Sequence, residues 1–345
     1  MPPRNSSSRV TLRDIAKAAG VHFTTVGMAL RGHPEISRAT KERIQTLARQ
    51  LGYRPDPMLS ALNAYRNAKS RPRYQASIAW INNWPEKEEL HRNPSFHEYY
   101  EGARARADEL GYVVEEFWLR GEGMHPSRLH DILLARNIEA VLLAPQPESR
   151  MFIPMDYSQF AVIAFGYSLQ PSVFHVVTNH HFHSMNLLLE HLQELDYRRV
   201  GLFVATDWNE KVENSLLGGL ALARWRSKKL KNVPPLLDSR TSDETLRKWL
   251  DTHKPDVVVS HSGTYQRLVR LGYRMPEDIG FASMNLGPKE IPLSGLYQNN
   301  IQIGRAAVDF IVSMLHSGER GVPKIPMRTL VESEWKQGQT LRAEA

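Results

Sequence analysis

The sequence predicts two fold classes in one chain: a small all-α helix-turn-helix headpiece and a larger α/β domain of two lobes. The first prediction depends on residues 11–53, where three stretches with helical apolar spacing are divided by glycine-containing turns. The second depends on residues 75–345, where short apolar runs alternate with helical periods in two successive rounds. A third observation is charge, because the positive excess gathers in the N-terminal part.

The first helix is predicted to begin after Thr11. The Thr11 hydroxyl can accept an amide of the first turn, and Asp14 completes a pattern like a capping box. Residues 20–22 (GVH) end the helix, since glycine adopts the left-handed conformation without a steric penalty. The residues that share one apolar face are Leu12, Ile15, Ala16 and Ala19.

The second and third helices follow after short turns. The second is predicted over 23–30, with Val26 and Ala29 facing inward, and residues 31–34 end it. Ser37 caps the third, in which apolar residues recur at helical spacing until Gly52 closes it. Two helices joined by a glycine-containing turn of about three residues form a helix-turn-helix, which presents its second helix to the DNA major groove.

Charge supports a nucleic-acid partner for this headpiece. Residues 1–73 hold 14 Lys and Arg against 4 Asp and Glu, a balance of +10, whereas the rest of the chain holds 30 against 33, a balance of −3. A phosphate backbone attracts such a basic segment. The alternative is an ordinary small helical bundle with a solvated charged face, which does not explain this segregation.

Residues 55–66 are predicted to form a hinge helix. Pro57 suits a first helical turn, and Met58, Leu62 and Tyr65 then share one face. Residues 67–74 (NAKSRPRY) are polar and basic and are typical of a linker. The alternative for the hinge is an interdomain helix that never contacts DNA.

The larger domain is predicted to contain parallel sheets covered on both faces. Its strands are continuous apolar runs alternating with helices, and two such rounds indicate two similar lobes with a ligand cleft beyond the carboxyl ends of the strands. The predicted strands are 76–81, 111–114, 140–144, 161–165, 200–204, 257–259 and 279–282, and the predicted helices are 97–110, 184–195, 216–229 and 303–315.

Four neighbouring histidines, His175, His180, His181 and His183, raise the possibility of a metal site. We predict none, because the stretch contains no cysteine or carboxylate and alternate histidines on a strand and loop face opposite sides. Surface or pocket-lining imidazoles are the preferred interpretation. No pattern of paired nucleophile and base indicates an enzyme, and no cofactor is predicted.

The headpiece resembles that of the lac-repressor family of bacterial transcription regulators. The resemblance lies in T-L-x-D-I-A-x-x-A-G-V-x-x-x-T-V from Thr11, S-x-x-T-x-x-x-I from Ser37, and L-G-Y-x-P from Leu51. It implies that the second helix reads base edges and that a hinge leucine, here Leu62, enters the minor groove. The implied DNA-binding residues are Thr11, Leu12, Phe23, Thr24, Thr25, Met28, Arg31, Ser37, Thr40, Tyr53 and Leu62.

The second helix departs from the family pattern. The family usually has serine at the positions of His22 and Gly27, and often arginine at that of Met28. Met28 and Phe23 cannot make the bidentate bond that arginine makes to guanine, but they can pack on thymine methyl groups. We therefore hypothesise an operator recognised through apolar contacts and DNA shape.

The larger domain resembles the effector domain of the same family, which is similar to type I periplasmic sugar-binding proteins. The resemblance implies a sugar-like effector in the cleft, although the family's usual arginine and Asn-Asp pair stand here as Ser215 and His261-Ser262, and its aspartate as Asn285. Losing charge-assisted hydrogen bonds weakens the grip on a polar ligand. The candidate effector-binding residues are Trp80, Asn82, Asn83, Phe96, Tyr167, Asn179, Trp208, Ser215, His261 and Asn285.

The expected function is a sequence-specific DNA-binding transcription regulator, most simply a repressor, that acts as a homodimer on a palindromic operator in double-stranded DNA. The alternatives are a regulator without a small-molecule effector and a cytoplasmic sugar-binding protein. A polar, basic N-terminus, the absence of cysteine and the lack of a long apolar run predict a cytoplasmic, nucleoid-associated protein with no membrane segment. The predicted domains are a flexible N-terminus (1–9), the headpiece (10–54), the hinge and linker (55–74) and the two-lobed ligand-binding and dimerisation domain (75–345).

Overall fold

The computed structural model describes residues 10–30, 36–51, 53, 76–238, 241–287 and 293–343. The predicted hinge and linker, with Leu62, lie outside these residues, as do the predicted flexible N-terminus and Arg31.

The headpiece contains the three predicted helices, α1 (Leu12–Ala19), α2 (Phe23–Leu30) and α3 (Arg38–Gln50). The capping box at Thr11 is present, Gly20 ends α1 in the left-handed conformation with φ 66°, and Ser37 caps α3. These caps satisfy backbone groups that would otherwise lack partners at the helix ends. The helices pack around a small core formed by Ile15, Ala16, Val26, Ala29, Ile44 and Ala48.

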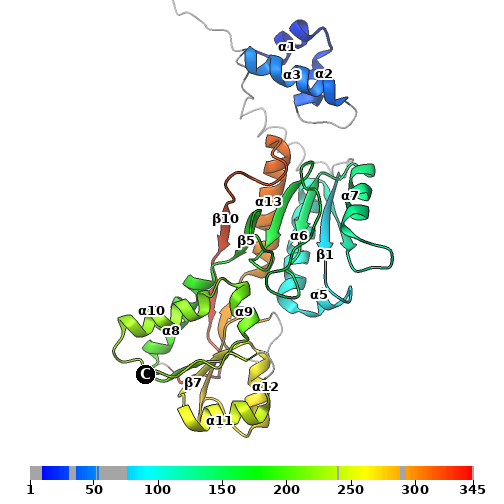
Figure 1. Cartoon of the computed structure of the whole chain (residues 1–345). Coiled ribbons are helices and arrows are strands. Elements are labelled where there is room, and N and C mark those ends of the chain that lie inside the picture. Colours follow the sequence, from blue (N-terminus) through cyan, green and yellow to red (C-terminus); the bar gives the residue numbers. More distant parts are fainter. Residues whose placement is uncertain are drawn as a thin grey trace, which may run out of the picture.

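The first lobe is a parallel six-stranded sheet in the order β10-β5-β4-β3-β1-β2 (Figure 1). Helices α6 (Pro94–Leu110) and α13 (Asn300–Ser317) cover one face, and α7 (Pro126–Ala135) covers the other. A four-residue helix, α5 (Glu89–Arg92), precedes α6. The strands are β1 (Ala76–Asn82), β2 (Tyr112–Trp118), β3 (Ala140–Leu143), β4 (Ala161–Phe165), β5 (His175–Asn179) and β10 (Arg328–Val331).

Helices α6 and α13 touch backbone to backbone. A Cβ atom at Gly304 would lie 2.0 Å from the Tyr99 carbonyl oxygen, and one at Gly102 would lie 2.1 Å from that of Ile301. Only glycine allows this approach at both positions. The helix from the C-terminal part of the chain is therefore built into the core of the first lobe.

The second lobe is a five-stranded sheet in the order β11-β9-β8-β7-β6, parallel except for β11. Helices α8 (His181–Glu194) and α10 (Ser215–Arg226) cover one face, and α11 (Asp243–His253) and α12 (Gly263–Arg270) cover the other. A short helix, α9 (Thr206–Lys211), follows β6. The strands are β6 (Val200–Leu202), β7 (Val257–Ser260), β8 (Gly280–Ser283), β9 (Ser294–Tyr297) and β11 (Glu334–Lys336).

The predicted small helical domain and two-lobed α/β domain are confirmed, and several element boundaries were wrong. Helix α8 begins at His181, not at residue 184, and α10 ends at Arg226, not at residue 229. His181 and His183 therefore lie in the first turn of a helix, which corrects their expected placement on a strand and loop. Among the described residues, no helix is both long and apolar enough to cross a bilayer.

Candidate DNA-reading surface and interlobe cleft

The exposed face of α2 carries the predicted base-reading side chains. Phe23 is 41% exposed, Thr24 is exposed and Met28 is partly exposed. His22 Nδ1 lies 2.8 Å from the Thr24 hydroxyl, and the His22 and Phe23 rings are 4.4 Å apart. The His22 side chain thus contacts the first turn of α2 through Thr24. The resembling family usually has serine at the position of His22.

The predicted phosphate-side residues lie at the helix ends. The Thr11 hydroxyl donates to Asp14 at 2.7 Å, and this bond helps to hold the pKa of Asp14 below its usual value. The Ser37 and Thr40 hydroxyls are 2.8 Å apart at the start of α3. Tyr53 and Leu12 are partly buried against the headpiece core, and Thr25 is partly exposed. The local fold therefore constrains most of these groups.

A cavity of about 40 Å³ lies between the two lobes. Of the predicted effector residues, Phe96, Tyr167 and Trp208 line it. Its walls come largely from the carboxyl ends of β3, β4 and β5 and from α9. His181, one of the histidines interpreted as surface or pocket-lining, also lines it. Sequence reasoning missed the other polar lining residues, which are Ser95, Gln146, Ser168, Thr178, Lys211 and Gln298.

Three other predicted residues, Trp80, Asn82 and Asn83, do not line the cavity. Trp80 is fully buried in the first-lobe core, with its ring 5.0 Å from that of Phe165, so its assignment to the cavity was wrong. Asn82 donates to the Glu116 carboxylate at 2.9 Å. Asn83 donates to the Gln146 side chain at 2.9 Å and thereby holds a cavity residue in position.

His261 and Asn285 form a partly buried polar pair in the second lobe, 3.0 Å apart. The His261 ring meets the Trp208 ring edge-on at 4.7 Å, and burial lowers the pKa of His261, which favours the neutral imidazole. Its buried Nε2 has no hydrogen-bond partner within the described part of the chain. Ser215 is the first residue of α10 and does not line the cavity.

Aromatic rings meet across the cleft. Phe96 from the first lobe and Trp208 from the second are 6.2 Å apart with an interplanar angle of 16°. Asn93 accepts the Ser95 and Phe96 amides and begins α6 there, which fixes the backbone of Phe96. The Trp84 ring lies 6.0 Å from Phe96 on the first-lobe side.

Polar contacts from α9 also join the lobes. The Ser149 amide donates to Asp207 at 2.8 Å, and its hydroxyl donates to Glu210 at 3.1 Å. Burial raises the pKa of Asp207, but the Ser149 hydrogen bonds and the Lys211 ammonium outweigh it and hold that pKa below its usual value. Lys211 donates to the Pro147 carbonyl, and Arg150 pairs with Glu210 at 3.3 Å.

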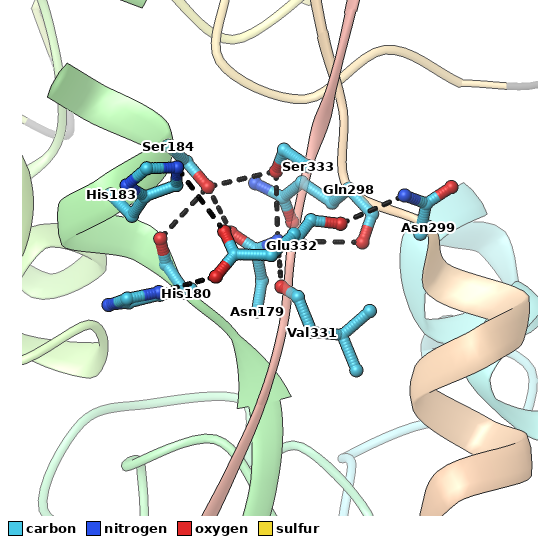
Figure 2. A network of polar contacts seen from close by, with 9 residues as sticks. All are labelled: Asn179, His180, His183, Ser184, Gln298, Asn299, Val331, Glu332 and Ser333. Atoms are coloured by element: carbon cyan, nitrogen blue, oxygen red, sulfur yellow. Dashed lines mark hydrogen bonds and ion pairs between the residues drawn. The ribbon is translucent and has the colours of Figure 1, made fainter. Parts of the chain in front are cut away.

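The chain passes between the lobes three times, and Asn179 ties these crossings together (Figure 2). Its side-chain amide donates to the Val331 carbonyl at 3.0 Å and to the Ser333 hydroxyl at 2.9 Å, and it lies 3.5 Å from the Gln298 carbonyl. Its oxygen accepts from Ser184. Asn179 is 1% exposed and lies at the crossings between the lobes, not in the cavity wall.

Glu332, on one of these crossings, contacts two of the four neighbouring histidines. Its carboxylate lies 2.9 Å from His180 Nδ1 and 3.6 Å from His183 Nε2 (Figure 2). A carboxylate does therefore approach the histidines, but from a distant part of the sequence. Within the described ranges, no group of three or more His, Asp or Glu side chains has an arrangement suited to a metal ion.

Comparison with known proteins gives matches over both parts of the chain. Residues 11–56 match the family model "Bacterial regulatory proteins, lacI family". The transcriptional repressor CytR of Escherichia coli strain K12 is 24% identical over 351 residues, covering 93% of this chain and 94% of that protein. The structure of the CelR–cellobiose complex matches with TM-score 0.58 and 18% identity, covering 96% of this chain and 100% of that chain. The lac repressor dimer bound to operator matches with TM-score 0.57 and 17% identity, covering 97% and 100%.

Proposed function

Because this chain belongs to the lacI family of bacterial regulatory proteins, we propose that it binds a palindromic operator as a homodimer and represses the adjacent genes. It is a DNA-binding transcription regulator and not an enzyme. The observation that carries the proposal is the capped helix-turn-helix whose second helix exposes Phe23 and Thr24. Its site of action is the chromosome, in the cytoplasm.

The proposed base contacts are those of Phe23, Thr24 and Met28, because they lie on one helix and reach its exposed surface. The proposed backbone contacts come from residues at helix ends, where hydroxyls and amides can meet phosphates. This set comprises Thr11, Leu12, Thr25, Arg31, Ser37, Thr40 and Tyr53. Leu62 is proposed as the minor-groove wedge.

Selection of bound DNA from a random duplex library tests this function. The full chain should enrich a palindrome, and Thr24→Ala or Phe23→Ala should weaken binding to it by about 1–3 kcal/mol per subunit contact. Phe152→Ala is a matched control, because Phe152 is an exposed phenylalanine in the first lobe. Failure to enrich any sequence, with an intact fold by circular dichroism, would contradict the proposal. Light scattering that reports a monomer bound to one half-site would contradict the dimer.

We propose that the interlobe cleft is the effector site and that the effector is sugar-like. The structural neighbours include a cellobiose complex, and this cleft combines aromatic rings with amide and hydroxyl side chains, which suit a ring with several hydroxyls. Phe96, Tyr167 and Trp208 would contact its faces, and Gln146, Ser168 and Gln298 its hydroxyls. His261 Nε2 is available as an acceptor beside Trp208.

A regulator without a small effector is the second candidate, and the small size of the cavity favours it. Calorimetry against a panel of mono- and disaccharides separates the two candidates. Heat of binding for one sugar, lost in Trp208→Ala, supports the effector site. A flat response across the panel would contradict the effector site. The proposal that the protein binds DNA would still stand.

A further inference from the structure

We propose that α9 is a latch that fills and closes the cleft with the chain's own side chains, so that an effector enters only when the latch releases. The effector-bound form is then more open than the latched form. This inference rests on the proposed effector site, but its structural part is measurable without any effector.

The first argument is steric. The cavity of about 40 Å³ is far smaller than the roughly 150 Å³ of an apolar cavity that holds benzene. A planar ring between Phe96 and Trp208 would need them roughly 7 Å apart, twice the carbon contact distance of about 3.5 Å, and their centroids are 6.2 Å apart. Trp208 must therefore move away from Phe96 before a ring enters.

The second argument is the polar contact set beside those rings. Asp207, Glu210 and Lys211 of α9 contact the first-lobe segment 147–150, through the Ser149 amide and hydroxyl, the Arg150 guanidinium and the Pro147 carbonyl. One six-residue helix thus supplies both Trp208 and the polar contacts that hold it in place. Release of α9 would empty the aromatic site and separate the lobes in one movement.

The third argument is the position of the pivot. Asn179, Ser184 and Ser333 bind two of the crossings to each other, and Asn299 binds the third through the Glu332 carbonyl. None of these residues belongs to α9. Loss of the latch contacts leaves these hydrogen bonds unchanged. The lobes can therefore rotate about the crossings while the hydrogen bonds at the crossings stay intact.

Distance measurement between spin labels on the full chain tests the latch. The chain contains no cysteine, so Glu122→Cys in the first lobe and Lys248→Cys in the second place the only two labels on each chain. Both positions are exposed. Asp207→Asn with Glu210→Gln removes the acidic charges of the latch at nearly constant size, and Phe96→Ala removes the aromatic contact from the opposite lobe. Glu190→Gln with Glu244→Gln is the matched control, since both are exposed acids of the second lobe outside the latch.

The latch variants should lengthen the interlobe distance or add a longer population, and the control pair should not. If the open form is about a tenth of the wild-type population, a sugar that binds should bind the Asp207→Asn, Glu210→Gln variant, which keeps Phe96, about tenfold more tightly. An unchanged distance in folded latch variants would overturn the latch, as would a sugar that shortens the distance. Flat calorimetry in every variant together with a lengthened distance supports the latch and contradicts the effector site alone.

Discussion

Phe96 and Trp208 stack across the interlobe cleft with their ring planes 16° apart, although one belongs to α6 of the first lobe and the other to α9 of the second. This contact means that the aromatic wall of the cleft is a joint product of both lobes. The two rings contact each other only while the lobes are together. The contact is therefore a direct reporter of interlobe geometry.

The first prediction concerns the energy of this contact. Phe96→Ala, Trp208→Ala and the double variant should show a coupling of about 0.5–1.5 kcal/mol in urea unfolding, since paired aromatic rings contribute that much beyond their burial. The same cycle on Trp84 and Trp208 is the control. It removes no direct ring contact, so its coupling should be smaller. Additive effects of Phe96→Ala and Trp208→Ala would show that the stacking contributes nothing measurable.

The second prediction concerns the backbone contact between α6 and α13. Gly304→Ala places a Cβ atom 2.0 Å from the Tyr99 carbonyl oxygen, so the helices must separate, and we expect a loss of about 3 kcal/mol or more in the free energy of unfolding. Gly263→Ala is the control, because nothing lies within 4 Å of a Cβ atom there and the residue begins α12. Equal stability of the two variants in urea titration would refute the expected clash.

The third prediction concerns acid. Hydrogen bonds from Arg305 and Arg106 lower the pKa of Glu109 from its ordinary 4.5 to about 2. A carboxylate with a lowered folded-state pKa adds stability above pH 4.5 and loses that contribution as the pH falls towards 2. The melting temperature of the wild type should fall as the pH is lowered over this window. In Glu109→Gln, measured beside it, the fall should be smaller. Glu244→Gln, on the exposed face of α11, should leave the decline unchanged.

The fourth prediction concerns base specificity. Met28→Arg should add a preference for guanine at one position in each half-site, with a discrimination of about 1–3 kcal/mol, because the guanidinium can bond guanine O6 and N7 together. Selection with the variant, beside the wild type, gives the measurement. Met28→Lys is a useful comparison, since lysine adds charge without the rigid fork. Enrichment of the same sequences by Met28→Arg and wild type would show that this position does not face bases.

The fifth prediction concerns Asn179 at the crossings between the lobes. Asn179→Leu removes the hydrogen bonds to Val331 and Ser333, which keep His180 and Ser184 as partners, so we expect a cost of about 0.5–1.5 kcal/mol for each bond lost. A lowered free energy of unfolding together with a broader interlobe distance distribution is expected. Ser184→Ala, which removes one neighbour of Asn179, should have the same sign and a smaller size. A narrow, unchanged distribution in Asn179→Leu would indicate that the crossings are held by the strands alone.

Local signals in the sequence were sufficient for the headpiece. Thr11, Gly20 and Ser37 mark helix ends through their own side chains or backbone freedom, and each prediction was confirmed. Helix α8 has no side-chain cap at His180, so its true beginning carried no such signal and was missed. Helix α10 ends where Ser227 becomes extended, which apolar spacing alone does not indicate.

The cleft was predicted only in outline. Aromatic residues such as Phe96 and Trp208 can be named as candidate ligand contacts from their residue type alone. Gln146 and Gln298 have no distinguishing local pattern. They line the cavity because strand ends from distant segments meet there. Asn179 was named as a polar side chain that could bind the effector, yet its burial against Val331 and Ser333 depends on a crossing that returns from the far end of the chain.

The placement of α13 and β10 has a consequence for the order in which the chain folds during synthesis. The first lobe takes four strands from before residue 166, but its covering helix and edge strand arrive only with residues 300–331. The parallel strands of the second lobe are complete by Tyr297. On the ribosome, the four parallel strands of the second lobe can therefore pair before the first lobe receives its last helix, and β11 joins the second lobe afterwards.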